Sequence, residues 1–136
     1  MRILSAVTAT AVLLLASPAL AGEFKVYPGA KIDERATREG TGTVYTTADP
    51  FDKVAAFYKG IGTEYMMPRA SGTSGKPKKR GGYDLWEAYF IFDGAKELAD
   101  SKVWAKVQRP ALGLYKEDLD SGKVRELTVI VLAKKG

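Results

Sequence analysis

The stretch DPFDKVAAFYKG, which runs from Asp49 to Gly60, carries the clearest structural signal in this chain of 136 residues. Its apolar residues recur at intervals of three and four, so one side of a helix would be apolar. Pro50 suits the first helical position, Asp49 can accept a capping hydrogen bond, and Gly60 suits the left-handed closing position. We therefore predict a helix from Pro50 to Lys59 that packs on a sheet.

Segments on both sides of this helix have the patterns of strands. In residues 84–92, alternate side chains would project to the two faces of a strand, and the side chains of both faces are largely apolar. This pattern indicates a strand that lies centrally in a sheet. Weaker patterns predict strands at 24–27, 43–47, 64–67, 103–109 and 124–133, a turn at 120–123, a partly helical connector at 31–40 and a short helix or turn at 93–100. This order predicts a single α+β domain, with a mostly antiparallel sheet of about five strands, one main helix (50–59) packed on it, and a short second helix.

The first 21 residues have the pattern of a secretory signal peptide. Arg2 precedes an apolar run that ends at Ala16, and Ala19-Leu20-Ala21 matches a cleavage site. The run is shorter than the roughly 20 apolar residues that cross a bilayer. We therefore expect cleavage near Ala21, a mature domain at 22–136 without a membrane span, and a periplasmic or secreted location.

The chain contains no cysteine and no histidine. This composition excludes a histidine general base, a cysteine nucleophile, and metal sites built on thiolate or imidazole ligands. Carboxylates, lysine, tyrosine, serine and threonine remain as reactive groups. We expect no metal and no cofactor, and a non-enzymatic function is favoured over an enzymatic one.

Three segments carry a resemblance to known proteins: YPGAKIDE at 27–34, YTTADPFDKVAAFYKGIG at 45–62 and DGAKELADSKVWAKVQRP at 93–110. They resemble a family of small exported bacterial proteins of unknown function that share a YPGA start and a Thr-x-Asp-Pro-Phe helix ending in Phe-Tyr. The resemblance implies export and an α+β fold. It implies no activity and no catalytic residues.

Residues 69–83 are rich in glycine, serine, lysine and proline, which predicts an exposed loop. Without Arg2 the mature chain has 20 Lys and Arg against 16 Asp and Glu, a net charge of +4, and without this loop the remainder has a net charge of −1. The basicity is therefore local to five residues of the loop, which are Arg69, Lys76, Lys78, Lys79 and Arg80. Such a patch attracts polyanions, and the flanking Tyr65 and Tyr83 could stack on sugars or bases. The alternative is a basic loop that only stays solvated. An acidic envelope polymer is the expected partner in the first case, because export leaves cytoplasmic nucleic acid out of reach.

Two motifs in the chain are incomplete. The segment SGTSGKP lacks the first glycine of a phosphate-binding loop, where Ala70 stands, and Pro77 replaces the required hydroxyl. The segment DLDSG has Gly122 at the third ligand position of a calcium loop and Thr128 in place of its bidentate glutamate. We predict neither a nucleotide site nor a calcium site.

Glu87 is the one charge within the apolar part of strand 84–92, so a buried Glu87 needs a partner, and Arg109 and Lys106 are the candidates. A catalytic carboxylate, a structural ion pair and an edge position facing water are all open interpretations.

The aromatic residues could instead line an apolar ligand pocket under the helix, or simply form core: Trp86, Phe90, Phe92 and Trp104. The leading hypothesis is an exported, non-enzymatic module that binds an envelope protein or an anionic polymer. One alternative is a carboxylate- or lysine-based enzyme whose site is the group Glu87, Arg109 and Lys106; the other is a carrier of small apolar ligands.

Overall fold

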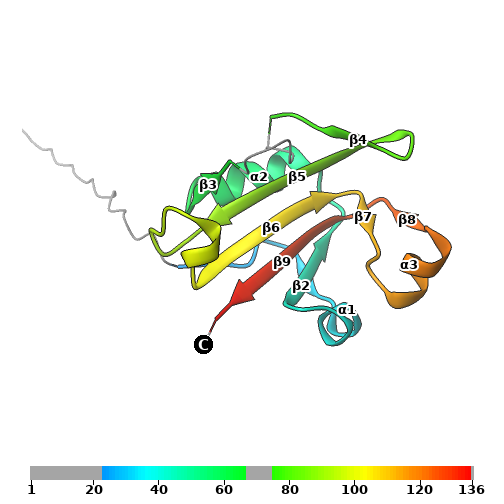
Figure 1. Ribbon diagram of the computed structural model, residues 1–136, viewed down its shortest axis with the longest axis horizontal. Helices are drawn as coiled ribbons and strands as arrows, with labels where there is room; N and C mark the ends of the chain where they lie inside the picture. Colours follow the sequence, from blue (N-terminus) through cyan, green and yellow to red (C-terminus); the bar gives the residue numbers. More distant parts are fainter. Residues whose placement is uncertain (1–22, 67–74, 136) are drawn as a thin grey trace, which may run out of the picture.

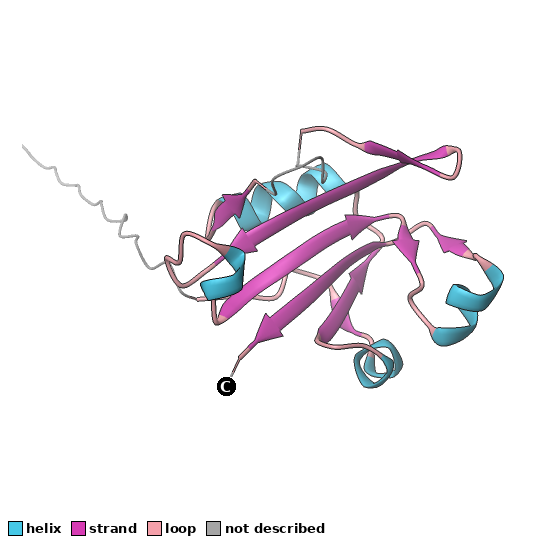
Figure 2. Ribbon diagram, in the orientation of Figure 1, coloured by secondary structure: helices cyan, strands magenta, loops and turns pink. Residues whose placement is uncertain are grey.

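The computed structural model describes residues 23–66 and 75–135. In this part of the chain a twisted antiparallel sheet carries a helix on one face (Figure 1), and shorter helices lie at its margins (Figure 2). The predicted α+β class with a mostly antiparallel sheet is confirmed. The main sheet has seven strands, where about five were expected.

Strands and helices follow one another in an order that brings distant segments together. They are β1 (Lys31–Ile32), α1 (Glu34–Glu39), β2 (Thr43–Thr47), α2 (Phe51–Lys59), β3 (Thr63–Tyr65), β4 (Lys78–Arg80), β5 (Tyr83–Ile91), the 3-10 helix η3 (Leu98–Asp100), β6 (Val103–Arg109), β7 (Ala111–Leu112), α3 (Lys116–Ser121), β8 (Val124–Arg125) and β9 (Thr128–Lys134). The sheet order is β1-β2-β9-β6-β5-β3, with β4 also paired to β5, while β7 and β8 form a separate ribbon. The C-terminal strand β9 therefore lies in the middle of the sheet.

Helix α2 forms where its apolar spacing predicts it. Phe51, Val54, Ala55 and Tyr58 are its buried residues. Both predicted caps are wrong. Pro50 occupies the N-cap without a side-chain acceptor, and Gly60 has a right-handed φ of −77°. The carboxylate of Asp49 accepts a hydrogen bond from the Tyr27 hydroxyl at 2.6 Å, so a tertiary contact has taken the oxygen that would have capped the helix.

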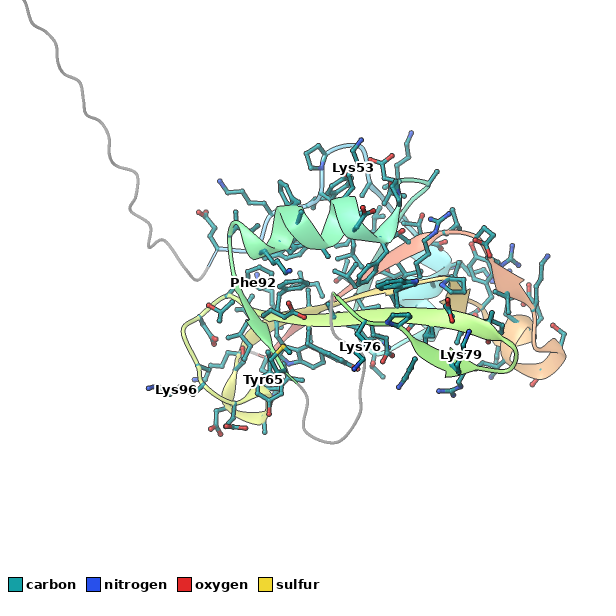
Figure 3. All side chains as sticks on the ribbon, turned by 90° about the horizontal axis from the view of Figure 1, so that it is seen from above. Lys53, Tyr65, Lys76, Lys79, Phe92 and Lys96 are labelled. Atoms are coloured by element: carbon teal, nitrogen blue, oxygen red, sulfur yellow. The ribbon has the colours of Figure 1, made fainter. Side chains whose placement is uncertain are left out.

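The main core lies between α2 and the sheet. Phe92 lies there in Figure 3, between the helix and the strands seen edge-on. Its buried members come from α2, from the strands β5, β6 and β9 and from two loop positions, and are Tyr27, Phe51, Val54, Ala55, Tyr58, Ala88, Phe90, Phe92, Ala105, Val107 and Ile130. Burying a side chain of the larger kind stabilises a fold by about 1.5–3 kcal/mol. This layer therefore supplies most of the stability of the domain.

The N-terminal segment 24–27 is not a strand, contrary to the prediction. It lies on the core and is held there by Tyr58, whose hydroxyl donates to the Lys25 carbonyl at 2.8 Å and accepts from the Tyr27 amide at 3.0 Å. Phe24 stacks on the Tyr58 ring with a centroid distance of 5.6 Å. Burial raises the pKa of the Tyr58 hydroxyl, which stays protonated and able to donate.

Two predictions near the C-terminus also need correction. The predicted turn at 120–123 is the end of helix α3, which closes at Gly122 with a φ of +73°. The predicted strand 124–133 is divided between β8 and β9, because β8 turns aside to pair with β7. Among the helices in the described ranges, none is long and apolar enough to cross a membrane.

Candidate functional site

The face of the sheet opposite α2 is only partly covered. Directly opposed residues on neighbouring strands project to the same face of a sheet. The pairs Tyr89 with Lys106 and Lys106 with Val131 therefore place Lys106 between two neighbours on this face. Figure 3 shows that the labelled Tyr65 and Lys76 lie on this side of the sheet, across the strands from α2.

A pocket of about 340 Å³ lies on this face and is here called the Lys106 pocket. Its floor is the sheet, and its walls are the end of α1 and the segment after β7. Most of its lining is apolar, and the full set is Ala36, Gly40, Thr41, Val44, Tyr89, Trp104, Lys106, Gln108, Leu112, Gly113, Leu114, Val129 and Val131. Pockets for small molecules begin at about this size and have this mainly apolar character.

The two walls of the Lys106 pocket are tied to each other beside it. The Tyr115 hydroxyl donates to the Asp33 carboxylate at 2.7 Å, and Asp33 also caps α1 through the Ala36 amide. The guanidinium groups of Arg35 and Arg125 lie over the Tyr115 ring, at 4.5 and 4.8 Å from its centroid. These contacts hold α1 and the segment before α3 at a fixed distance, so the pocket is built into the fold.

Among the residues that the structure describes, Lys106 is the one charged residue that lines this pocket. Its ammonium makes no hydrogen bond or ion pair to any residue in the part of the chain that the structure describes. Burial lowers the pKa of Lys106; the charge of Glu87 opposes this shift, and Lys78 adds to it. The lysine is therefore held partly out of water without a direct counter-ion.

Glu87 is buried, with 7% of its surface exposed. Its ion-pair partner is neither Arg109 nor Lys106, the two residues that the sequence predicted. Its carboxylate lies 3.2 Å from the Lys78 ammonium, which β4 brings alongside β5. Glu87 faces Gln108 across the strands and so shares a face with Lys106. The Gln108 amide donates to the Pro110 carbonyl at 3.2 Å.

Arg109 is not brought to Glu87 and Lys106. It faces Trp86 on the α2 side of the sheet. Its guanidinium donates to the Asp49 carbonyl at 3.3 Å and to the Thr128 hydroxyl at 3.1 Å, which fixes β6 to the start of α2. The predicted group of three therefore divides into Glu87 and Lys106, which share the face opposite α2, and a structural arginine on the other face.

The basic segment is only partly a loop. Arg69 lies outside the described residues. Lys78–Arg80 form β4, which joins β5 through Gly81 and Gly82 in a hairpin that extends past the N-terminal end of α2 (Figure 1). Both glycines have positive φ, at 56° and 88°, as tight hairpin turns of the favoured twist require.

Two of the basic side chains already have acidic partners. Lys78 pairs with Glu87, and Lys79 lies 2.7 Å from Asp84, whereas Lys76 and Arg80 are exposed. The flanking Tyr65 donates its hydroxyl to Glu97 at 2.8 Å, and Tyr83 faces Arg80 across the hairpin. Polyanion binding by this segment stays a prediction, with fewer uncommitted cations than the sequence alone suggested.

The four aromatic residues proposed for a ligand pocket under the helix do not share a site. Phe90 and Phe92 are fully buried core, whereas Trp86 is half-buried at the start of α2, with its ring 5.7 Å from that of Phe51. Trp104 is on the opposite face, 6.1 Å from the ring of Tyr89. The two tryptophans therefore lie in two different hollows on opposite faces.

Sequence reasoning named Lys106 as a partner for Glu87 and as a member of the candidate enzyme site with Glu87 and Arg109, and it missed the rest of the pocket. The available signal was a lysine in the middle of an alternating strand, at a position where an apolar residue would fit. Comparisons of the chain with protein-family models, curated proteins and solved structures find no match. The resemblance to small exported proteins therefore stays a hypothesis.

Proposed function

We propose that this protein is an exported, non-enzymatic envelope module that binds a small ligand with one anionic group and an apolar body in the Lys106 pocket. The observation that carries the proposal is the Lys106 ammonium, which lines the pocket without a hydrogen bond or ion pair to any described residue. Burying a charge is costly unless it is paired. A carboxylate or phosphate of the ligand would supply the missing partner.

The charges around the pocket support an anionic ligand. Lys78, Glu87 and Lys106 lie together on this face, and the only carboxylate of the three is in contact with Lys78. The cluster therefore has an excess of one positive charge. One ligand anion balances it, whereas a cationic ligand would be repelled.

The rest of the lining supports an apolar body beside that anion. Val44, Val129 and Val131 provide branched aliphatic surface, and Trp104 and Tyr89 provide two aromatic rings. The volume of about 340 Å³ favours a compact molecule. A short fatty acid or an aromatic carboxylate has the required chemistry.

The test uses octanoate as the probe, with octanol and octylamine as neutral and cationic molecules of the same chain length. Trp86→Phe leaves Trp104 as the only tryptophan, so its fluorescence reports on the Lys106 pocket. We expect octanoate to change the Trp104 emission in a saturable manner and the amine not to do so. Binding of all three probes with equal affinity would contradict the proposed role of charge.

A matched pair of variants tests the lysine itself. Lys106→Met keeps the length of the side chain and removes the charge, while Lys102→Met removes the charge of an exposed lysine. A hydrogen bond to a charged group contributes about 1.5–3 kcal/mol, so we expect octanoate to bind Lys106→Met at least tenfold more weakly. Lys102→Met should bind as the parent protein does; an equal loss in both variants would mean that only net charge matters.

A further inference from the structure

We infer that the groove at the start of α2 is a second binding site, and that it takes a cationic segment of a partner, such as an exposed arginine side chain. This groove, here called the Trp86 groove, has a volume of about 580 Å³. It is lined by Pro50, Phe51, Asp52, Tyr83, Asp84, Trp86, Arg109, Pro110 and Glu126. It lies on the α2 side of the sheet and is separate from the Lys106 pocket.

The groove exists because the helix is shorter than the strand beneath it. Helix α2 and strand β5 have nine residues each. At about 1.5 Å per residue the helix is roughly 13 Å long, whereas the strand at about 3.3 Å per residue reaches roughly 30 Å. Strand β5 therefore extends past the N-terminal end of α2 into the hairpin, as Figure 1 shows. Its residues Tyr83 and Trp86 are left half-buried.

The charges in the Trp86 groove are opposite in sign to those of the chain as a whole. Within the described ranges, three carboxylates line it, from Asp52, Asp84 and Glu126, against one arginine, in a chain with a formal net charge of +5. They do not form a metal-binding cluster within the described ranges. An acidic rim around exposed aromatic surface suits a cation, because an arginine side chain gains from both the carboxylates and the face of an indole ring.

The positively charged side chains near the groove do not prevent a cationic ligand from binding there. The guanidinium of Arg109 is engaged by the Asp49 carbonyl and the Thr128 hydroxyl, and it is 3.9 Å from Glu126. The ammonium of Lys79 contacts Asp84, but its side chain is 82% exposed. Exposed pairs of this kind contribute little and exchange readily for another cation. The positive helix end at Phe51 is offset by Asp52 in the first turn.

The test uses a capped arginine tripeptide, with a capped citrulline tripeptide as its uncharged counterpart. Trp104→Phe leaves Trp86 as the only tryptophan, so its emission reports on this groove. We expect the arginine peptide to change the Trp86 emission in a saturable manner that weakens as salt is added, and the citrulline peptide to bind more weakly. Binding of octanoate but not of the arginine peptide at Trp86 would overturn the inference.

Two double variants with the same loss of charge complete the test. Asp52→Asn with Glu126→Gln removes two carboxylates of the groove, and Asp100→Asn with Asp120→Asn removes two exposed carboxylates elsewhere. We expect the first to bind the arginine peptide roughly five- to tenfold more weakly and the second to bind it as the parent does. Equal binding by both would overturn the inference. Thermal unfolding verifies that each variant is folded. Octanoate binding at the Lys106 pocket, measured by Trp104 emission in the Trp86→Phe background, is expected to be the same in both double variants as in the parent.

Discussion

The two faces of the sheet differ in what their side chains do. The face under α2 is filled along its middle by apolar and aromatic residues such as Phe90 and Val107. The opposite face holds the buried Glu87 and Gln108 and the partly buried Lys106. The larger core therefore lies under α2, while the other face combines a smaller apolar cluster with polar groups whose burial is costly and which suit this face to binding. The members of the smaller cluster are Ala36, Val44, Ala111, Leu114 and Val129.

Adjacent residues of β5 give the sharpest contrast between the faces. Phe90 is fully buried under α2, whereas Tyr89 is half-buried on the other face. We expect Phe90→Ala to lower the free energy of unfolding by about 3–5 kcal/mol, because it leaves a cavity in close-packed core. Tyr89→Ala should cost about 1–2 kcal/mol. Urea denaturation measures both, and equal losses would refute the assignment of stability to the α2 face.

The hydroxyl groups of two tyrosines test the same contrast on a smaller scale. Tyr58→Phe removes the acceptor of the Tyr27 amide and the donor to the Lys25 carbonyl. Leaving such buried groups unpaired costs about 1–3 kcal/mol, so we expect a loss of that size. Tyr89→Phe is the control. Its hydroxyl makes no hydrogen bond to the described residues, so the denaturation midpoint should stay nearly unchanged.

A substitution at Lys106 tests whether a side chain on the face opposite α2 lowers the stability of the domain. We expect Lys106→Met to raise the free energy of unfolding by about 1 kcal/mol at pH 7, because it replaces a poorly paired charge with an apolar side chain of similar length. A stabilised variant with lost octanoate binding would separate the binding role of Lys106 from a structural one. A destabilised variant would show instead that Lys106 contributes to the fold.

The same residue predicts a dependence on pH. Its pKa in the folded protein lies below the usual value of 10.5, so the unfolded chain binds more protons in the interval between the two values. The stability of the folded protein therefore rises with pH between the folded pKa of Lys106 and 10.5, and below the folded pKa the cost of burying the charge is present in full and constant. The advantage of Lys106→Met over the parent should shrink from pH 7 to pH 10. Measuring the difference between the two proteins cancels the effect of the tyrosines, which both contain.

The smallest expected effect concerns the basic hairpin, which lies outside both faces of the core. Replacing Lys76, Lys79 and Arg80 by glutamine should change the free energy of unfolding by less than about 0.5 kcal/mol, because all three are exposed. Lys78 is left intact, since it pairs with the buried Glu87.

If the hairpin binds an acidic polymer, three contacts predict a slope of log affinity against log salt near −2, at about −0.7 per contact. The triple variant should lose that slope. Binding of lipopolysaccharide that is identical in the parent and the variant would leave the hairpin as a solvated turn.

Local patterns in the sequence predicted much of the fold. The spacing of Phe51, Val54 and Tyr58 predicted α2, and the alternation in 84–92 predicted β5, because periodicity depends only on neighbours along the chain. The strand β4 was missed because its residues are lysines and an arginine with no apolar alternation. It forms through pairing with β5 and through the turn at Gly81 and Gly82.

The sequence by itself determined the α+β class, the main helix and the absence of histidine and cysteine chemistry. Only the tertiary structure decided which charges meet. Glu87 pairs with Lys78 and not with Arg109, Asp49 accepts from Tyr27 and caps no helix, and Lys106 lines a pocket. These contacts depend on strand order and register, above all on β9 entering between β2 and β6, and such long-range pairing leaves no local pattern in the chain.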